Sequence, residues 1–257
     1  MSLELIKAIR QITGAGMVDI KKALDEAGGD KERAIGVLRQ AGSKIAAKKS
    51  DRQIKEGVIA MARAGAKLAV LELGCETDFV ARNEDFIKVA QSLAQKLLRS
   101  GPNDFSGWAQ EQIRNELIVK IGENLQLGKY NLIEGELVGT YLHSNKKVAG
   151  VVVLNGGNME LAKDMAMQIA ASAPRYLRPE DVPSAVVDKE TEIYREQLKN
   201  EGKPETMWDK ILPGKLQKFY SEVCLLKQVY IKDDKKTIED LLKESGASIK
   251  EFYYYSL

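Results

Sequence analysis

The amino-acid sequence predicts an α+β protein with three kinds of part: a small helical head, a core of two related α+β subdomains, and an inserted antiparallel helical hairpin. Three observations support this prediction. The hydrophobic period is helical over residues 1–45 and becomes strand-like from Glu56. A strand–turn–strand–helix pattern then occurs twice, roughly eighty residues apart, which is typical of related units that share a core. A highly charged stretch, 183–226, interrupts the second unit.

The head, residues 1–45, is predicted to contain three short helices. The first ends at a Thr-Gly-Ala-Gly sequence, 13–16, because glycine accepts the positive φ of a helix end. The second ends at the glycine pair 28–29, and the third is expected to end at Gly42. A head of this size buries little apolar surface, so it should be only modestly stable. Residues 46–55 follow as a polar, basic connector.

The first core subdomain is predicted over residues 56–133. It begins with two strands joined by a turn at residues 64–65, which is the pattern of a β-hairpin. A helix follows that Asn83 caps, and its apolar residues recur at i, i+3, i+4 and i+7 along one face. A second helix is expected over about 106–121.

The second core subdomain is predicted over residues 134–182 and 227–257. It repeats the hairpin, with a turn at residues 144–145, and then a helix. After the insertion the chain returns with a helix over 238–244 and an aromatic strand over 252–255.

The insertion, 183–226, is predicted to form two antiparallel helices that project into solvent, because acidic and basic side chains occur in equal numbers over 188–218. Pro213 and Gly214 should break or kink the second helix. That helix is more apolar than one partner helix requires: Met207, Trp208, Ile211, Leu212, Leu216, Phe219 and Tyr220. Either these residues close the hairpin onto the core, or they form a contact between two copies of the chain. We favour some self-association.

Composition restricts the class of protein. The 257 residues include 39 basic and 37 acidic side chains, which gives a net charge of +2. This small charge argues against sequence-independent binding to nucleic-acid phosphates. No apolar run reaches the ~18 residues of a membrane span, and the chain does not open with a signal-peptide pattern. Cys75 and Cys224 offer no disulfide framework and suit a reducing compartment. We therefore expect a cytoplasmic protein that binds neither nucleic acid nor membrane.

The residue inventory contains little that could carry catalysis. With His143 as the single histidine, HExxH and Cys₂His₂ metal sites are impossible. The sequence has no GxSxG elbow and no GxxxxGK[ST] phosphate loop, and His143 falls in a predicted hairpin turn. We expect no cofactor, no metal and no bond chemistry. A Cys75-dependent enzyme is the least favoured alternative, because no positioned base accompanies the thiol.

The strand-to-helix connection differs between the two core subdomains. In the second it is the plain turn 155–158, whereas in the first it is the longer segment 74–83. Phe79 and Val80 could fold back onto the core as a hydrophobic staple, and composition alone favours that interpretation. The surplus length favours a functional segment instead.

Two sequences in this chain resemble the signatures of one protein family. They are Thr13–Met17 followed by Lys21–Leu24, and Glu76–Asn83. Further matches are Lys120–Asn124, Gly139–Tyr141 with His143, and Ala170–Ser172. On these motifs, which run in the family's order and spacing from about Leu3 to Phe252, the chain resembles bacterial elongation factor Ts.

The resemblance implies a guanine-nucleotide exchange factor that acts on the translational GTPase elongation factor Tu. It also implies a ubiquitin-associated-like head, a hairpin that contributes to dimer formation, and, in some members, assembly as a homodimer or as two copies with two partners. The segment that would contact the partner is Thr77, Asp78, Phe79 and Val80, with the Phe79 ring wedged beside the nucleotide so that it disturbs the Mg²⁺ site. The alternative is a non-catalytic adaptor that uses the head alone.

The resemblance further assigns partner contacts outside that segment. In the head and first core subdomain these would be Arg10, Met17, Val18, Lys21, Ile121 and Gly122. For Met17 and Val18 the competing interpretation is the core of the helical head. Many relatives have histidine where this chain has Gln168, so the corresponding contact with the partner's distal domain is expected to change. Some relatives have a C-terminal helical extension after the aromatic strand, and we expect it to be missing here. Any contact that this extension makes with the partner should therefore be weaker or absent.

Overall fold

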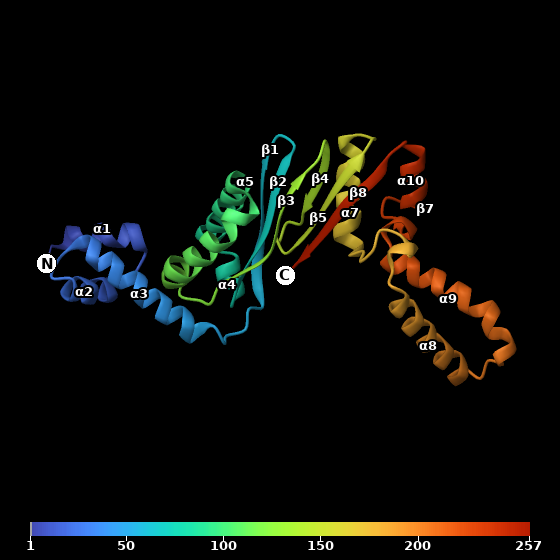
Figure 1. The fold of residues 1–257 in the computed structure, drawn as a ribbon, viewed down its shortest axis with the longest axis horizontal. Coiled ribbons are helices and arrows are strands. Elements are labelled where there is room, and N and C mark those ends of the chain that lie inside the picture. Colours follow the sequence, from blue (N-terminus) through green and yellow to red (C-terminus); the bar gives the residue numbers. More distant parts are fainter. Residues whose placement is uncertain (1) are drawn as a thin grey trace. The chain divides into compact units, whose positions relative to one another are not determined.

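The computed structural model describes residues 2–257, with the backbone alone for residues 43–46 and 48 (Figure 1). It is a mixed helix-and-sheet protein, as the sequence predicts. Its internal contacts separate it into two compact units, one reaching Glu134 and the other spanning Gly135–Ser256. Each unit contains an antiparallel three-stranded sheet.

The elements of the first unit begin with three helices and end with a strand. They are α1 (Leu3–Thr13), α2 (Met17–Glu26), α3 (Lys31–Lys49), β1 (Glu56–Ala64), β2 (Lys67–Cys75), α4 (Asp78–Ala81), α5 (Glu84–Gln112), a π-helical turn (Ile113–Leu117), α6 (Ile118–Ile121) and β3 (Gln126–Glu134).

The first two predicted helices of the head end where expected, but α3 does not end at Gly42. It continues to Lys49, so the predicted boundary between head and connector falls inside this helix. A Cβ placed on Gly42 would lie 2.7 Å from Cγ2 of Val119 and 2.8 Å from the carbonyl oxygen of Asn115. This glycine therefore permits close packing of α3 on the π-helical turn and α6, and it does not terminate the helix. Val119 packs against the apolar core of the head.

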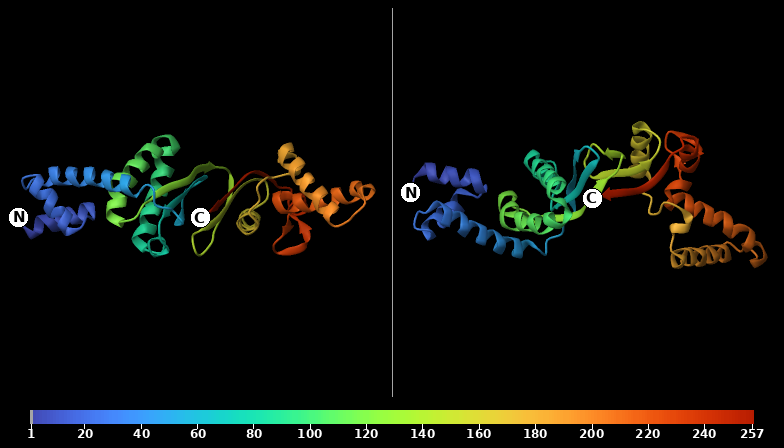
Figure 2. Two further views of the ribbon diagram at one scale, coloured as in Figure 1. Left: turned by 90° about the horizontal axis from the view of Figure 1, so that it is seen from below. Right: turned by 45° about the horizontal axis from the view of Figure 1, so that its top comes forward.

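The first sheet has the strand order β1-β2-β3, and α5 covers one of its faces (Figures 1 and 2). β1 and β2 form the predicted hairpin, in register from Glu56 opposite Cys75 to Ala64 opposite Lys67. The strand β3 was not predicted from the sequence. Its apolar residues do not alternate strictly, so the strand has no strong local signal, and its pairing with β2 is a long-range contact.

The helical stretch that follows α4 contains one sharp break. Gly101 has φ 75° and ψ 167°, so α5 consists of two helical pieces separated at this residue. The second piece leads through the π-helical turn into α6, which ends at Gly122. The predicted second helix, about 106–121, corresponds to this continuous stretch.

The elements of the second unit begin with two strands and end with a strand. They are β4 (Leu137–Leu142), β5 (Val148–Asn155), α7 (Met159–Ser172), α8 (Ser184–Asn200), α9 (Trp208–Val223), β6 (Val229–Tyr230), β7 (Asp233–Thr237), α10 (Ile238–Glu244) and β8 (Ser248–Ser256), with short 3₁₀ turns at Pro179–Asp181, Glu205–Met207 and Leu225–Lys227.

The second sheet has the order β4-β5-β8, so in both sheets the third strand pairs with the second strand of a hairpin. The helix α7 packs on β4 and β5, as α5 packs on β1 and β2. Asn158 caps α7 through its Oδ1 atom, which accepts a hydrogen bond from the Leu161 amide at 2.9 Å. Both units thus carry a hairpin, a covering helix and a third strand in the same order.

The helices α8 and α9 lie side by side (Figures 1 and 2). The predicted break at Pro213 and Gly214 is wrong, because α9 runs from Trp208 to Val223 as one helix. Pro213 lies inside this helix, and buried residues on its later turns, including Phe219 and Val223, pack with Val182 and Cys224. This packing is consistent with the interpretation in which part of the apolar face closes onto the same unit.

Candidate protein-binding site

The segment between β2 and α5 separates its two apolar residues. Val80 packs partly against the core of the first unit, whereas the Phe79 side chain is 83% exposed. The staple interpretation is therefore right for Val80 and wrong for Phe79. A single exposed apolar residue is ordinary on a protein surface. What distinguishes Phe79 is that hydrogen bonds fix the backbone that precedes it.

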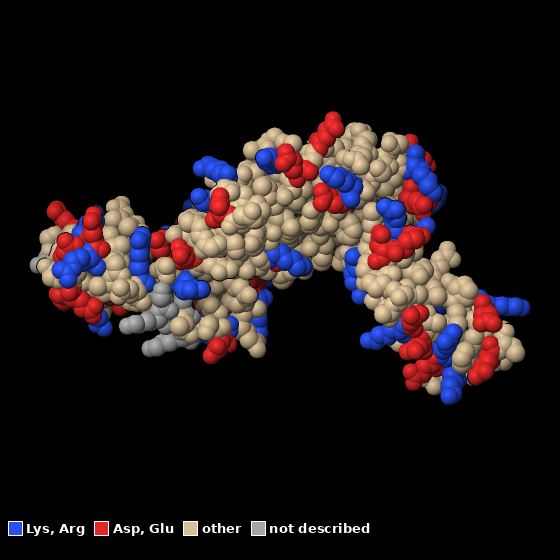
Figure 3. All heavy atoms as spheres, viewed as in Figure 1, with Lys and Arg blue, Asp and Glu red and all other residues tan. Residues whose placement is uncertain are grey.

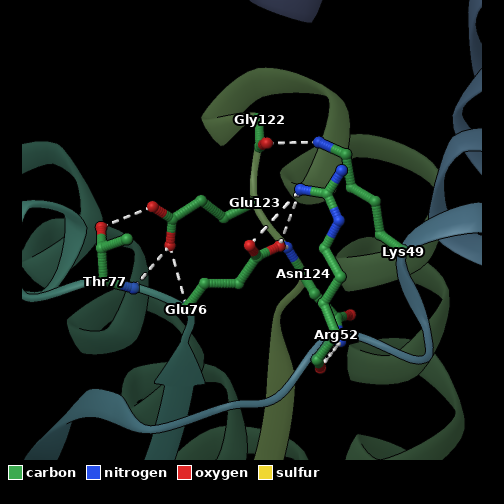
Figure 4. Close-up of polar contacts among 7 residues, drawn as sticks. All are labelled: Lys49, Arg52, Glu76, Thr77, Gly122, Glu123 and Asn124. Carbon is green, nitrogen blue, oxygen red and sulfur yellow. Dashed lines mark hydrogen bonds and ion pairs between the residues drawn. The ribbon is translucent and has the colours of Figure 1, made fainter.

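The backbone before Phe79 is bound by one carboxylate. Oε2 of Glu123 accepts hydrogen bonds from the amides of Glu76 at 2.9 Å and Thr77 at 3.0 Å. Oε1 of Glu123 accepts a third bond, from the Thr77 hydroxyl at 2.5 Å. Figure 4 shows the Glu123 side chain reaching across to these groups. Hydrogen bonds to a charged acceptor contribute about 1.5–3 kcal/mol each, more than neutral ones do.

The same two segments are joined a second time in the opposite direction. Oε1 of Glu76 accepts a hydrogen bond from the Asn124 amide at 2.6 Å. Each segment therefore supplies a carboxylate that binds the other's backbone. We call the four residues that make these bonds, Glu76, Thr77, Glu123 and Asn124, the latch.

The end of α3 and the chain that follows it also contact the latch. The Asn124 side-chain amide donates to the Arg52 carbonyl at 3.1 Å, and Lys49 donates to the Gly122 carbonyl (Figure 4). The Arg52 guanidinium lies 3.4 Å from Oε2 of Glu76, but 54% of the Arg52 side chain is exposed, so this ion pair adds little.

The short helix α4 carries Phe79 away from the latch. Thr77 caps it, because its Oγ1 accepts a long hydrogen bond from the Val80 amide at 3.4 Å. Asp78 pairs with Arg82 at 3.3 Å in an exposed i,i+4 contact. Asn83 then caps α5, since its Oδ1 accepts from the Asp85 amide at 2.8 Å. This Asn83 cap is the one that the sequence predicts.

The head residues assigned by the resemblance lie on its surface. Met17 is 52% exposed and Val18 is 65% exposed, so neither belongs to the core of the helical head. Arg10 on α1 and Lys21 on α2 are exposed as well. The buried face of α2 is instead formed by Ile20, Ala23 and Leu24.

The remaining predicted residues fall into two groups. Ile121 is half-buried against the first core, and Gly122 is the exposed end of α6, directly before Glu123. The fold therefore brings this pair to the latch. Gln168 is completely buried in α7, where its Nε2 donates to Gln228 and its Oε1 accepts from the Ile231 amide at 2.9 Å. A partner has no access to the Gln168 side chain in this conformation, so we correct its assignment as a direct contact.

Two functional candidates had no assigned role in the sequence analysis. Glu76 and Glu123 belong to the motifs that match the family, but neither residue type nor spacing shows that each carboxylate binds a backbone amide of the other's segment. The pairing joins segments that are far apart in the chain. The only local signal that points to them is that each of two matching motifs contains a glutamate, Glu76 in 76–83 and Glu123 in 120–124.

Other candidate chemistry in the molecule is sparse. Within residues 2–257, no three His, Cys, Asp or Glu side chains gather as a metal site. Both cysteines are buried, and burial, reinforced by Asp181 and Glu180, raises the pKa of the Cys224 thiol to about 11. His143 lies 3.0 Å from the Tyr141 hydroxyl.

Surface charge and hydropathy show no single dominant feature. On the face in Figure 3, basic and acidic side chains are intermixed over α8 and α9 and over the three N-terminal helices. No helix over the described residues is both long and apolar enough to cross a bilayer.

Comparison with known proteins gives one consistent family. The family described as "Elongation factor TS" matches residues 76–257. A protein named elongation factor Ts from Hydrogenobaculum sp. (strain Y04AAS1) is 43% identical over 270 residues, which cover 100% of this chain and 98% of the relative. Those from Aquifex aeolicus (strain VF5) and Deinococcus deserti are 43% and 40% identical, covering 100% and 99% of this chain and 98% and 99% of the relatives.

Proposed function

The chain belongs to the elongation factor Ts family, and we propose that it releases GDP from elongation factor Tu through the exposed Phe79 ring. It is a guanine-nucleotide exchange factor of translation elongation, which binds the GDP form of elongation factor Tu and allows GTP to enter. The adaptor alternative is not favoured, because the relatives match along the whole chain and not over the head alone.

Exchange of this kind requires no bond chemistry. An exchange factor must bind the nucleotide-free GTPase more tightly than the GDP-bound form, and linkage then weakens GDP binding by the same factor. The effect is a change in the free energies of the partner's states, so histidine, thiol and metal chemistry are not needed. A protein with a single histidine and two buried cysteines suits this task.

The observation that carries the proposal is the 83% exposure of Phe79 on a turn that the latch fixes. Burying a phenyl ring in a partner contributes about 1.5–3 kcal/mol. A typical coupling free energy between two sites is about 1–3 kcal/mol. One ring can therefore supply a large share of the coupling.

The site of action is the phosphate end of the partner's nucleotide. A GTPase holds GDP there through backbone amides, a lysine and a bridging Mg²⁺. The Phe79 ring wedges beside this site and disturbs the Mg²⁺ environment, with Thr77, Asp78 and Val80 as its neighbours. Asp78 is the polar companion of the ring.

Docking is distributed over further surfaces. Exposed Arg10, Met17, Val18 and Lys21 of the head contact the nucleotide-binding domain of the partner, and Ile121 and Gly122 contact it beside the latch. The exposure of the four head residues supports the first assignment, and the position of Ile121 and Gly122 next to the latch supports the second. Gln168 acts indirectly, by holding residues 228–231 in place.

The finer architecture belongs to the same proposal. The parts are a ubiquitin-associated-like head, 1–45, whose last helix continues to Lys49; the connector, 46–55, into which that helix extends; core subdomains at 56–133 and at 134–182 with 227–257; and a helical hairpin, 183–226. Exposed Ile193 on α8 and Met207 in the 3₁₀ turn before α9 are the surface through which two copies would associate. The protein acts in the cytoplasm, where translation takes place.

The direct test is release of a fluorescent GDP analogue from purified elongation factor Tu. Adding the full chain should accelerate release in proportion to its concentration until the complex saturates. An adaptor would bind elongation factor Tu and leave the release rate unchanged, and that result would contradict the proposed function.

A further inference from the structure

We propose that Glu123 is a positioning residue for exchange: it holds Phe79 in the orientation that engages the partner, without touching the partner's nucleotide site itself. This inference rests on the proposed function. It adds a specific role to a carboxylate that lies in a different segment from the Phe79 turn.

The first step is that α4 cannot fix its own direction. It spans only Asp78–Ala81, far below the length at which a helix is stable by itself. Its orientation is therefore set by what binds its ends. At the C-terminal end, Asn83 caps the next helix and Val80 packs on the core. At the N-terminal end, the hydrogen bonds to Glu123 include both amides that precede the helix.

The second step is that Glu123 is itself well anchored. It follows Gly122, which ends α6 in the left-handed conformation and donates to the Ile118 carbonyl at 2.9 Å. Ile118 is buried in the first core. The neighbouring Asn124 amide is held by Glu76 at 2.6 Å. The carboxylate therefore extends from a packed helix end and transmits that rigidity to the turn.

The third step is that the latch serves no packing need of the Phe79 ring. The ring is 83% exposed, so the core does not require it to point in any particular direction. Three hydrogen bonds to one charged acceptor nevertheless fix the turn that carries it. Such an arrangement pre-organises a binding group. The turn is already ordered when the protein has folded, so docking to the partner does not have to include the entropy cost of ordering it.

The kinetic consequence distinguishes positioning from docking. The head and the Gly122 region can form the initial complex whether or not the turn is ordered. Insertion of Phe79 occurs afterwards, on the way to GDP release. Loss of Glu123 should therefore lower the maximum rate of GDP release and leave the half-saturating concentration of this protein nearly unchanged. This is the pattern expected when the lost interaction is made only in the rate-limiting step.

The test measures GDP release from elongation factor Tu over a range of concentrations of the full-length protein. The variants are Glu123→Ala, Phe79→Ala, the double variant and Glu123→Gln. Glu123→Ala should lower the maximum rate about tenfold, within the range that misplacement of an active group causes. In the Phe79→Ala background the same substitution should have little further effect, because both changes remove one function. Glu123→Gln should recover most of the rate, since its carbonyl oxygen can still accept from both amides.

A matched control is Glu84→Ala. Glu84 lies at the first position of α5, beside the same turn, but its side chain is 89% exposed and, among the residues whose side chains the structure describes, forms an ion pair with Lys88 alone. This variant removes an equal charge without releasing the turn, so its release kinetics should equal those of the wild type. If Glu84→Ala matched Glu123→Ala, local charge and not positioning would be the cause.

The outcomes separate this inference from the proposed function. If Phe79→Ala released GDP as fast as the wild type, the proposed role of Phe79 would fail. If Phe79→Ala were slow while folded Glu123→Ala kept the wild-type maximum rate, only the positioning role would be overturned. Fully multiplicative effects in the double variant would also overturn it. Should Glu123→Ala fail to fold, Thr77→Val removes the hydroxyl that donates to Glu123 and also caps α4. This variant should lower the maximum rate by a smaller factor, while an unchanged rate would contradict the inference.

Discussion

The two strand-to-helix connections of this protein solve the same structural problem in different ways. In the second unit, Gly156 and Gly157 lead directly from β5 to Asn158, which caps α7. In the first unit, an extra helix, α4, stands between β2 and Asn83, which caps α5. The sheets have the same strand order and the covering helices have the same type of cap. The short turn shows that the extra helix is not required by this arrangement of strands and helix.

The surplus segment therefore has to be explained by something other than the fold. It holds Val80 on the core and leaves Phe79 exposed. Two carboxylates, Glu76 and Glu123, then fix its base. The comparison teaches that a protein can present an exposed apolar side chain by lengthening one copy of a repeated connection and anchoring it to a neighbouring turn.

The largest difference should be between two phenylalanines on either side of the Asn83 cap. Phe86 is 1% exposed in the first core, whereas Phe79 is 83% exposed. Phe86→Ala should lower the free energy of unfolding by about 3–5 kcal/mol, because it empties a packed site. Phe79→Ala should change it by less than about 0.5 kcal/mol. Chemical denaturation of both variants checks this, and comparable losses would show that Phe79 is part of the core.

Gln168 should give an intermediate effect in the second unit. Its buried side chain donates to Gln228 and Val229 and accepts from Ile231. Gln168→Ala leaves these groups without partners and should cost about 1–3 kcal/mol of unfolding free energy. The measurement is again denaturation, with Met167→Ala on the same helix as a comparison. A neutral Gln168→Ala would mean that residues 228–231 are held by other contacts.

The two caps should give the smallest and most similar effects. Asn83→Ala and Asn158→Ala each remove an N-cap and should each cost about 1 kcal/mol in unfolding free energy. Asn83→Ala should also slow GDP release modestly, since its cap supports the Phe79 turn, and this part is measured in the exchange assay. The comparison between the connections would be weakened if only one of the two caps proved stabilising.

Local features of the sequence predicted much of the fold. The hairpins, the helix with the Asn83 cap and the helix over 238–244 were all visible in short-range patterns, and the structure confirms them. Capping and hairpin formation depend on residues close in sequence, so local reasoning is sufficient for them.

The errors and omissions arose where distant segments meet. Gly42 was expected to end a helix, but it permits contact with Asn115 and Val119. The strand β3 is defined by its pairing with β2. For the candidate site, the resemblance located Phe79, but the hydrogen bonds between Glu123 and Thr77 depend on tertiary structure alone. None of these contacts leaves a pattern within one segment.

The central claim is that the exposed ring of Phe79 accelerates nucleotide release. The measurement that tests it most directly is the maximum rate of GDP release from elongation factor Tu at saturating concentrations of folded Phe79→Ala protein. Losing the burial of one phenyl ring, about 1.5–3 kcal/mol, predicts a rate at least about tenfold below that of the wild type. A rate equal to that of the wild type would contradict the claim.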